Sequence, residues 1–344
     1  MKTNASKKII AFLILFISLA SCKKEVKETT IQTETTIQNI DPLPSWNEGI
    51  NKEAIINYVN DVTTEGSANF IPVADRIATF DNDGTLWSEQ PIYFQLFFTM
   101  DRIKAMAPEH PEWKNKQPYK AVLDNDMEAL MAQGKKGLVE LMMTTHAGMT
   151  ADEFEKSVKD WIATAKHPTK NKPYNKLVYQ PMLELIDYLK ANDFKVFIVS
   201  GGGIEFMRPW AEEAYGIPKD QIVGSSLKEH FDNVNGKATI TKLPELDFYD
   251  DKEGKPVAIN KFIGRKPVFA GGNSDGDLQM LQYAASNPLK NLEVYIHHTD
   301  SVREWAYDRK SHIGTFDKGW DEAKQKGWLV VSMKDDWKVI YPGE

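Results

Sequence analysis

Two aspartates, Asp81 and Asp83, stand one residue apart in the stretch ATFDNDGTLW (78–87), directly after a short apolar run. Turn-forming residues and a hydroxyl accompany them, namely Asn82, Gly84 and Thr85. Two carboxylates at the end of a strand repel each other, which weakens a purely structural interpretation. An ordinary turn after a strand explains one aspartate and the glycine, but it does not explain the polar groups at the ends of the other predicted strands.

Polar or glycine residues end each of four short apolar runs that read as buried strands. The runs are RIATF (76–80), KVFIVS (195–200), PVFAGG (267–272) and EVYIHH (293–298). The polar groups at the ends of the last three are Ser200 with Gly201 to Gly203, Asn273 to Asp277, and His297 to Asp300. Ligands of open parallel sheets bind beyond the carboxyl ends of the strands, so these groups are expected to meet at one edge.

Helical patterns between these runs set the predicted fold class. Segments 180–192 and 204–216 have helical spacing, 51–63 packs as a further helix, and WLVVSM (328–333) adds a fifth strand. Strands that alternate with helices predict a Rossmann-like, doubly wound, mostly parallel α/β sheet. The Asn-Gly turn within 222–243 predicts a β-hairpin.

The long segment after the first strand is predicted to be a helical cap inserted into the core. It is far longer than an ordinary crossover and consists of helix-length patterns separated by Pro and Gly. We therefore expect a core made of residues 46–89 and 176–344, with a cap at 90–175.

Three motifs resemble those of the haloacid dehalogenase (HAD) superfamily. DNDGT (81–85) is similar to its DxDGT motif, VSGGG (199–203) to its second motif and GGNSDGDLQML (271–281) to its fourth. Within the superfamily the SGG and DLQML segments resemble the phosphoserine-phosphatase type. The likeness covers about residues 75–285, and the helical insertion lies where type-1 caps occur.

The resemblance implies a phosphatase that depends on Mg²⁺. A phosphoryl group and two carboxylates share a site only when a cation offsets their repulsion, and Mg²⁺ binds few carboxylates together with substrate phosphate. Asp81 would attack phosphorus as the nucleophile and form an aspartyl phosphate. Asp83 would protonate the leaving alcohol and later deprotonate the attacking water. The environments of the two carboxyl groups should therefore separate their pKa values.

Phosphate-binding groups and a lysine are assigned by the same resemblance. The Ser200 hydroxyl and the backbone N–H groups of Gly201 and Gly202 would hold phosphoryl oxygens, and the first motif would contribute Gly84 and Thr85 to the same site. Lys255 precedes a predicted helix with Pro256 at its first position, so it can reach the catalytic edge. The alternatives for this lysine are Lys261 and Lys266.

The predicted metal ligands depart from the family pattern at one position. They are Asp81, Asp83, Asn273 and Asp277, and the family usually has an aspartate where this chain has Asn273. An asparagine oxygen can bind Mg²⁺ but brings no charge. Asp275 is an extra acid that could compensate.

Two further groups have open roles. Glu89 lies near the position where phosphoserine phosphatases place a glutamate that binds the substrate amine, although it is offset by one residue. His297, His298 and Asp300 lie outside the motifs, and adjacent strand residues point to opposite faces, so at most one histidine would reach the site.

The N-terminus reads as an export signal. Three lysines precede the apolar stretch IIAFLILFISLA (9–20), and LASC (19–22) resembles a bacterial lipobox, so we expect a signal peptide at 1–21 and lipidation of Cys22. An ordinary secretory peptide or a membrane anchor is the alternative. Residues 22–45 are expected to form a flexible tether that leads to a lipid-anchored domain in the cell envelope.

The sequence as a whole predicts a Mg²⁺-dependent phosphatase for a small-molecule phosphate monoester. A net charge of −7 argues against nucleic-acid binding, and the membrane is expected to be contacted only through the lipid. Asp83 argues against dehalogenation, which needs neither a second aspartate nor a metal. The alternative is a non-catalytic lipoprotein of HAD fold that binds a phosphate ligand.

Overall fold

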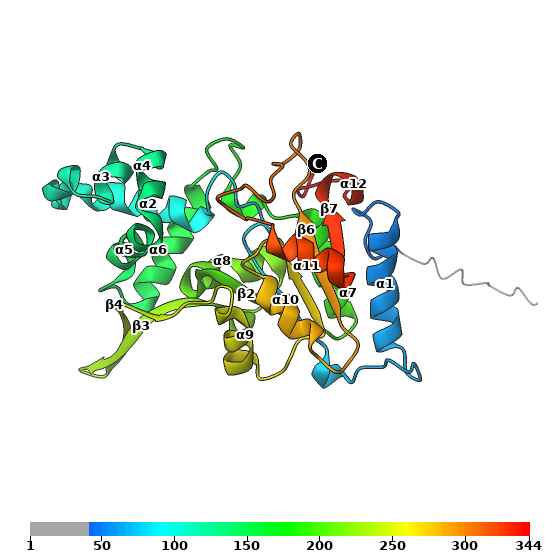
Figure 1. Cartoon of the computed structure of the whole chain (residues 1–344). Helices are drawn as coiled ribbons and strands as arrows, with labels where there is room; N and C mark the ends of the chain where they lie inside the picture. Colours follow the sequence, from blue (N-terminus) through cyan, green and yellow to red (C-terminus); the bar gives the residue numbers. More distant parts are fainter. Residues whose placement is uncertain (1–40) are drawn as a thin grey trace, which may run out of the picture. The chain divides into compact units, whose positions relative to one another are not determined.

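A seven-stranded sheet runs through the part of the chain that the structure describes (Figure 1). The computed structural model describes residues 41–344. The strand order is β4-β3-β2-β1-β5-β6-β7, and all neighbouring pairs are parallel except β3 and β4. This arrangement confirms the predicted α/β fold with a mostly parallel sheet. The strands are Ile77–Phe80 (β1), Lys195–Gly203 (β2), Ile222–Val234 (β3), Lys237–Phe248 (β4), Phe269–Gly272 (β5), Leu292–His297 (β6) and Leu329–Ser332 (β7).

Helices cover both faces of the sheet because successive strand residues point to opposite sides. Ala78 and Phe80 of β1 belong to one core cluster, together with side chains of α1, α7 and α8. Ile77 and, from β2, Phe197 belong to a second cluster with side chains of α9, α10 and α11. The helices of these two layers are Ile50–Thr63 (α1), Gln180–Ala191 (α7), Ile204–Tyr215 (α8), Gly254–Ala258 (α9), Leu278–Ala285 (α10) and Lys318–Lys326 (α11), and the short α12 is Met333–Asp336.

The long segment between β1 and β2 forms a set of helices with a small core of its own. Leu96 of α2, Val122 of α3, Leu130 of α4 and Leu141 of α5 belong to this core. The last helix, α6, differs, because its buried side chains, Val158 among them, belong to the main core cluster. The helices are Phe94–Met106 (α2), Tyr119–Leu123 (α3), Met127–Ala132 (α4), Gly134–His146 (α5) and Ala151–Thr164 (α6).

The predicted hairpin is formed by β3 and β4. Its two-residue turn consists of Asn235 and Gly236, both with positive φ, and Val234 pairs with Lys237. The hairpin is longer than predicted, because β4 continues to Phe248. In Figure 1 it extends away from the sheet below the α5 and α6 end of the insertion.

Two predicted boundaries are wrong. The folded unit begins at Asp41, not after residue 45, because Leu43 is fully buried and the Asp41 carboxylate accepts a hydrogen bond from Lys52 Nζ at 2.6 Å. Pro256 is the third residue of α9 rather than its first, since that helix begins at Gly254. The predicted signal peptide at 1–21, the lipidated Cys22 and the remainder of the tether lie outside the described residues.

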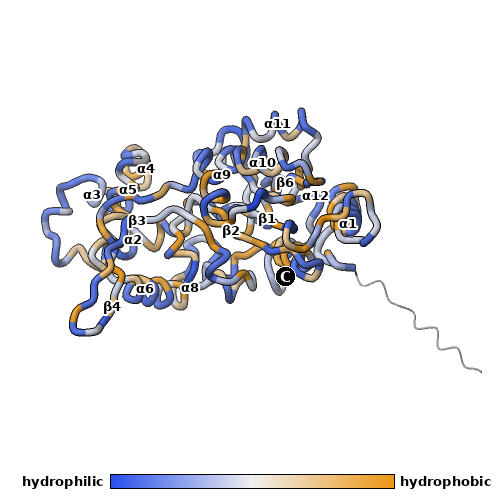
Figure 2. Tube along the Cα trace, turned by 90° about the horizontal axis from the view of Figure 1, so that it is seen from below, coloured by the Kyte–Doolittle hydropathy of each residue, from blue (hydrophilic) through white to orange (hydrophobic). Residues whose placement is uncertain are grey.

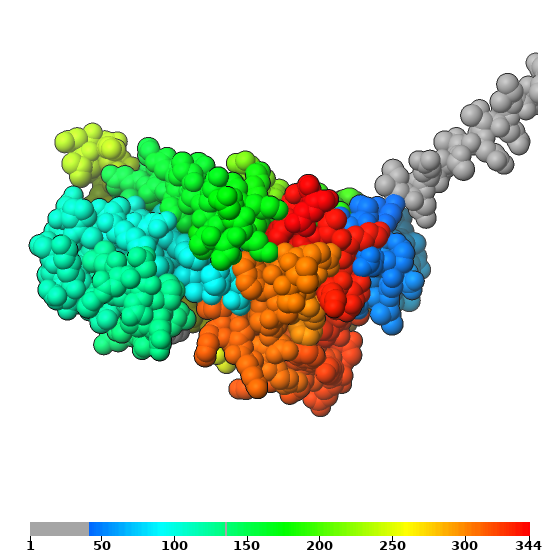
Figure 3. All heavy atoms as spheres, turned by 90° about the horizontal axis from the view of Figure 1, so that it is seen from above, coloured from blue at the N-terminus to red at the C-terminus, as the bar shows by residue number. Residues whose placement is uncertain are grey.

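Distant segments of the chain come together at one side of the molecule. Figure 2 shows hydrophobic stretches along the central strands β1 and β2 and a hydrophilic trace around α3. Figure 3 shows the segment after β6 against the beginning of the helical insertion, where Gln90 Nε2 donates to the Ile313 carbonyl at 3.3 Å. Among residues 41–344, no helix has the length and apolar character needed to cross a membrane.

Glu293 on β6 should make stability depend on pH. Its side chain is 5% exposed and its Oε1 accepts no hydrogen bond from the described residues, and burial raises its pKa from 4.5 to about 7. Because the folded pKa is the higher one, the folded protein loses stability as pH rises from about 4.5 to about 7. We expect Glu293→Gln to increase the free energy of unfolding by about 3 kcal/mol above pH 7 and by little near pH 4.

Urea denaturation of the parent and the Glu293→Gln variant across this pH range checks the prediction. A stability difference that stays constant with pH would show that the Glu293 carboxyl does not titrate in this way.

Candidate active site

Asp81 lies at the carboxyl end of β1, in the middle of the sheet. Its backbone N–H donates to the Gly271 carbonyl at 3.0 Å, which continues the pairing of β1 with β5. The chain order reverses at this pair of strands, and such switch points are where open sheets bind ligands. The buried Asp81 carboxylate lines a cavity of about 220 Å³.

Lys255 joins three strand ends in one ion-pair cluster. Its Nζ donates to Asp81 Oδ1 at 2.7 Å, to Asp277 Oδ1 at 2.7 Å and to the Val199 carbonyl at 2.8 Å. The lysine is almost fully buried, so these bonds occupy all three of its N–H groups. The alternatives are placed elsewhere, since Lys261 is exposed and Lys266 bonds Ser286.

The cluster is short of positive charge. Burial and the charge of Asp277 raise the pKa of Asp81 well above its ordinary value, although Lys255 works against the rise. Burial opposes the charged form of Lys255, but the nearby Asp277 and Asp81 outweigh it and raise its pKa. Two buried carboxylates thus share one ammonium group, and an additional cation would favour the ionised form of Asp81.

Asp83 faces the same cavity from the turn after β1. Its Oδ1 accepts a hydrogen bond from Trp87 Nε1 at 2.7 Å, and its Oδ2 would lie 3.6 Å from a Cβ added to Gly202. Burial raises its pKa to about 6. Gly84 shapes the turn with φ +74, and a Cβ there would collide with Asn273.

The loop after β5 supplies the other acid of the cluster. Asp277 Oδ2 accepts hydrogen bonds from the N–H groups of Asn273 at 2.9 Å and Ser274 at 3.0 Å. Asn273 Oδ1 accepts from Thr85 Oγ1 at 3.2 Å. Asp275 does not compensate for the missing acid, because its carboxylate instead accepts the N–H groups of residues 317–319.

The glycine turn at the end of β2, Gly201 to Gly203, lines the same cavity as both aspartates through Gly201 and Gly202. Ser200 is fully buried and its Oγ accepts the Gly202 N–H at 3.1 Å. The pairing of β2 with β3 shifts register between Ser200 and Gly203, so the backbone bulges at the cavity. The Gly203 N–H is bound by Gln95 Oε1 at 2.7 Å, from helix α2 of the insertion.

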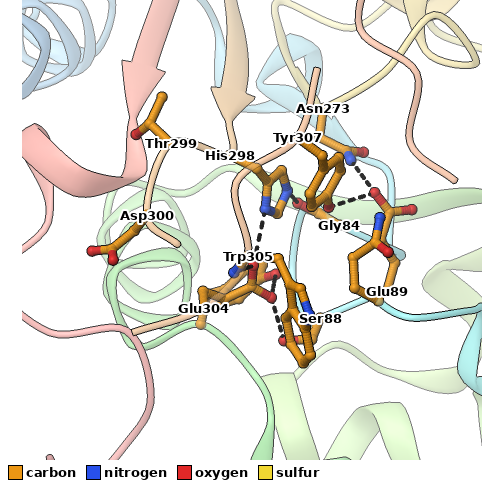
Figure 4. Close-up of polar contacts among 12 residues, drawn as sticks. Gly84, Ser88, Glu89, Asn273, His298, Thr299, Asp300, Glu304, Trp305 and Tyr307 are labelled. Carbon is orange, nitrogen blue, oxygen red and sulfur yellow. Dashed lines mark hydrogen bonds and ion pairs between the residues drawn. The ribbon is translucent and has the colours of Figure 1, made fainter. Parts of the chain in front are cut away.

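Glu89 supports the site from behind Asn273, as Figure 4 shows. Its Oε1 accepts hydrogen bonds from Asn273 Nδ2 and Tyr307 OH, both at 2.7 Å. Burial raises the pKa of Glu89 well above its ordinary value. The carboxyl group also lines the cavity, and only its Oε1 is engaged by these two bonds.

His298 holds the first motif in place, and the other groups after β6 do not reach it. Its Nε2 donates to the Gly84 carbonyl at 2.8 Å, and its Nδ1 lies 3.4 Å from Glu304 Oε2 (Figure 4). His297 packs against Trp320 on the other side of the strand. The Asp300 carboxylate accepts the N–H groups of residues 302 and 303.

Sequence reasoning missed the residues that the insertion and the hairpin bring to the cavity. Gln95 and Thr99 come from α2, Met142 from α5, and Tyr249 and Asp251 from the segment after β4. A buried glutamine within the apolar run FQLFF is the one signal that could have indicated Gln95. The others belong to no motif, because their position depends on how the helices pack.

The donor set fits a divalent cation only in part. Within residues 41–344 no group of three or more His, Cys, Asp or Glu side chains is arranged to hold a metal ion by itself. However, Asp81 and Asp83 face one cavity with a shortage of positive charge. Mg²⁺ suits such a site, because it is commonly bound by one or two carboxylates with substrate phosphate and water as further ligands.

A parallel sheet that carries these motifs at its strand ends defines a class of hydrolase. The chain belongs to the haloacid dehalogenase-like hydrolase family, whose model matches residues 78–282. A comparison with curated proteins finds no match.

One solved structure with a TM-score above 0.5 agrees with the fold. A conserved protein of unknown function from Anaerococcus prevotii DSM 20548 is 18% identical, with a TM-score of 0.53 over 85% of this chain and 94% of that one. A phosphoserine phosphohydrolase-like protein from Francisella tularensis subsp. tularensis SCHU S4 is 16% identical, with a TM-score of 0.36 over 73% of this chain and 99% of that one. At 18% identity the likeness to the Anaerococcus protein concerns the fold alone.

Proposed function

We propose that this protein is a Mg²⁺-dependent phosphatase that hydrolyses a small-molecule phosphate monoester through an aspartyl phosphate on Asp81. The observation that carries the proposal is the buried Lys255, which joins the carboxylates of Asp81 and Asp277 at the edge of a cavity. Asp83 beside it has a raised pKa of about 6. Membership of the hydrolase family supports the same reaction class.

The chemistry would proceed in two displacements. Asp81 attacks phosphorus, the bond from phosphorus to the leaving oxygen breaks, and Asp83 gives its proton to the leaving alcohol. Asp83 then takes a proton from water, whose oxygen attacks phosphorus and releases phosphate and Asp81. A carboxyl group with a pKa of about 6 suits both directions of proton transfer near neutral pH.

The remaining groups would bind and orient the phosphoryl group. Ser200 and the backbone N–H groups of Gly201 and Gly202 would hold its oxygens, and Gly84 and Thr85 shape the facing turn. Lys255 would orient Asp81 and offset charge. Asp277 orients Lys255 and its loop, because both its oxygens already accept hydrogen bonds.

The proposed holders of Mg²⁺ are Asp81, the backbone carbonyl of Asp83 and Asn273 Oδ1. Asp277 would bind the ion through water, because both its oxygens already accept hydrogen bonds. When bound, the ion would offset the repulsion between the carboxylates and the phosphoryl oxygens. Because Asn273 brings no charge, we expect metal affinity to depend mainly on Asp81.

Removal of the metal should abolish activity reversibly. We expect hydrolysis of p-nitrophenyl phosphate with Mg²⁺, loss of nearly all of it in EDTA, and recovery when Mg²⁺ is added in excess. Circular dichroism in EDTA controls for unfolding. Activity that persists in EDTA would remove the metal from the proposal, and no hydrolysis of a broad panel of phosphate esters would favour the non-catalytic binding protein.

We also propose that the protein is an exported lipoprotein anchored through Cys22. The proposal rests on the lysines, apolar stretch and LASC sequence of the first 22 residues. Metabolic labelling with palmitate should mark the parent protein and not Cys22→Ser, and labelling of both would contradict it.

A further inference from the structure

Two side chains of helix α2 that line the cavity each carry one polar atom without a hydrogen-bond partner among the described residues. Gln95 is 8% exposed, and no described residue accepts a hydrogen bond from its Nε2. Thr99 is fully buried, and its hydroxyl likewise has no partner among the described residues. Buried polar groups in native proteins nearly always have partners, so two exceptions in one cavity indicate a ligand.

The orientation of Gln95 is fixed by the glycine turn. Its Oε1 accepts the Gly203 N–H at 2.7 Å, so its Nε2 is the end that remains unpaired. A Cβ added to Gly202 would lie 3.5 Å from Gln95 Oε1 and 3.6 Å from Asp83 Oδ2. The carboxamide and the carboxyl group of the proposed general acid therefore border the same glycine and line the same cavity.

The free hydroxyl of Thr99 is unusual for a threonine within a helix of this chain. Thr63 and Thr145 each donate to the carbonyl four residues earlier, at 2.8 and 3.0 Å. Thr99 makes no such bond, although the Gln95 carbonyl occupies the equivalent position. The hydrogen-bonding capacity of its buried hydroxyl is therefore unused among the described residues.

The two groups lie on one face of α2, since residues four apart in a helix are neighbours. Along the helix axis they are separated by about 6 Å. The same cavity is lined by the apolar side chains of Leu96, Leu138, Val139 and Met142 and by carboxyl groups, Glu89 and Asp251 among them. It thus combines apolar walls with two neutral hydrogen-bonding groups of α2, of which Gln95 Nε2 donates and the Thr99 hydroxyl both donates and accepts. Its carboxyl groups disfavour an anionic leaving group.

We propose that Gln95 and Thr99 select a phosphate monoester whose leaving group is an uncharged polyhydroxy alcohol, such as a polyol or sugar. Oxygen atoms of the alcohol that lie within about 5.4 Å of the phosphate, the length of one helical turn, would pair with Gln95 Nε2 and the Thr99 hydroxyl. This inference rests on the proposed phosphatase activity and assigns specificity to helix α2.

Paired esters that differ only in hydroxyl groups test the inference. The pairs are glycerol 3-phosphate with n-propyl phosphate, and ribose 5-phosphate with tetrahydrofurfuryl phosphate. We expect kcat/KM to be about 10-fold or more higher for the hydroxylated member of at least one pair, because an ester without these hydroxyl groups leaves both side chains unpaired. Equal or reversed values in both pairs would overturn the inference and leave the phosphatase proposal intact.

Substitutions then assign the preference to the two residues. Thr99→Val removes the hydroxyl at nearly constant volume and should lower the kcat/KM ratio of the preferred pair several-fold. Gln95→Glu keeps the acceptor for the Gly203 N–H but removes the donor, and it should lower the same ratio. Thr145→Val is the matched control, because this buried insertion threonine does not line the cavity, and the ratio should stay unchanged.

A stability measurement separates a ligand-binding role from a structural one. An unpaired buried hydroxyl destabilises the ligand-free protein, so Thr99→Val should keep or raise its Tm. A marked fall in Tm would show that the hydroxyl has a structural partner and would overturn its assignment. If no ester is hydrolysed, the phosphatase proposal fails, and calorimetric binding of the same pairs to Asp81→Asn decides whether α2 still selects hydroxyl groups.

Discussion

Asp81→Asn should lower the kcat for phosphate ester hydrolysis by about 10⁴-fold or more. The amide is a poor nucleophile and forms no acyl phosphate, so the two-step route is lost. Asn has nearly the same volume as Asp, and Lys255 retains Asp277 and the Val199 carbonyl as partners. The fold should therefore persist, and steady-state kinetics with p-nitrophenyl phosphate measures the loss.

Asp275→Asn is the matched control for this substitution. Its carboxylate belongs to the loop after β5 but binds the backbone of residues 317–319, so activity should fall far less. Hydrolysis by Asp81→Asn at a rate close to that of the parent would exclude Asp81 as the nucleophile. Mass spectrometry of the parent quenched in acid should in turn detect a phosphate adduct on the peptide that contains Asp81.

Lys255→Met should reduce both stability and activity. The change leaves Asp81 and Asp277 buried without their shared cation, and breaking a buried ion pair on one side typically costs about 3 to 5 kcal/mol. We expect kcat/KM to fall by about 10² to 10³-fold, as when one preorganised donor is removed from an active site. Urea denaturation and steady-state kinetics measure the two effects.

Lys261→Met provides the comparison, because this exposed lysine lies in the short π-helix Ile259–Ile263 directly after α9. Neither stability nor activity should change appreciably. If Lys255→Met were as stable and active as Lys261→Met, the ion-pair cluster would contribute nothing to the site.

The strand ends are predictable because two simple regularities act together. Short apolar runs such as RIATF and PVFAGG are typical of strands that are buried on both faces of a parallel sheet. Parallel strands bring their carboxyl ends to one edge of the sheet. These regularities are enough to predict that Asp81, Ser200 and Asp277 lie close together. The position of Lys255 is predictable from the motif order, although the helix around it begins two residues earlier than Pro256.

The walls of the cavity could not be predicted in the same way. Gln95 and Thr99 line the cavity only because this face of α2 packs towards the glycine turn. Helical spacing shows which residues share a face, but it does not show which part of the protein that face contacts. The contact between Glu89 and Tyr307 joins positions more than 200 residues apart, and neither residue belongs to a motif. Such pairings depend on tertiary packing.

The aromatic packing of the insertion determines which of its parts can move. Phe98 of α2 lies 5.8 Å from Phe154 of α6 and 5.5 Å from Phe206 of α8, measured between ring centroids. These ring contacts pack the first and last helices of the insertion against the Rossmann-like core. A rotation of the whole insertion as one rigid lid would separate the rings from one another. Entry to the cavity should therefore require only a local outward shift of α5, whose Leu138 and Met142 line it.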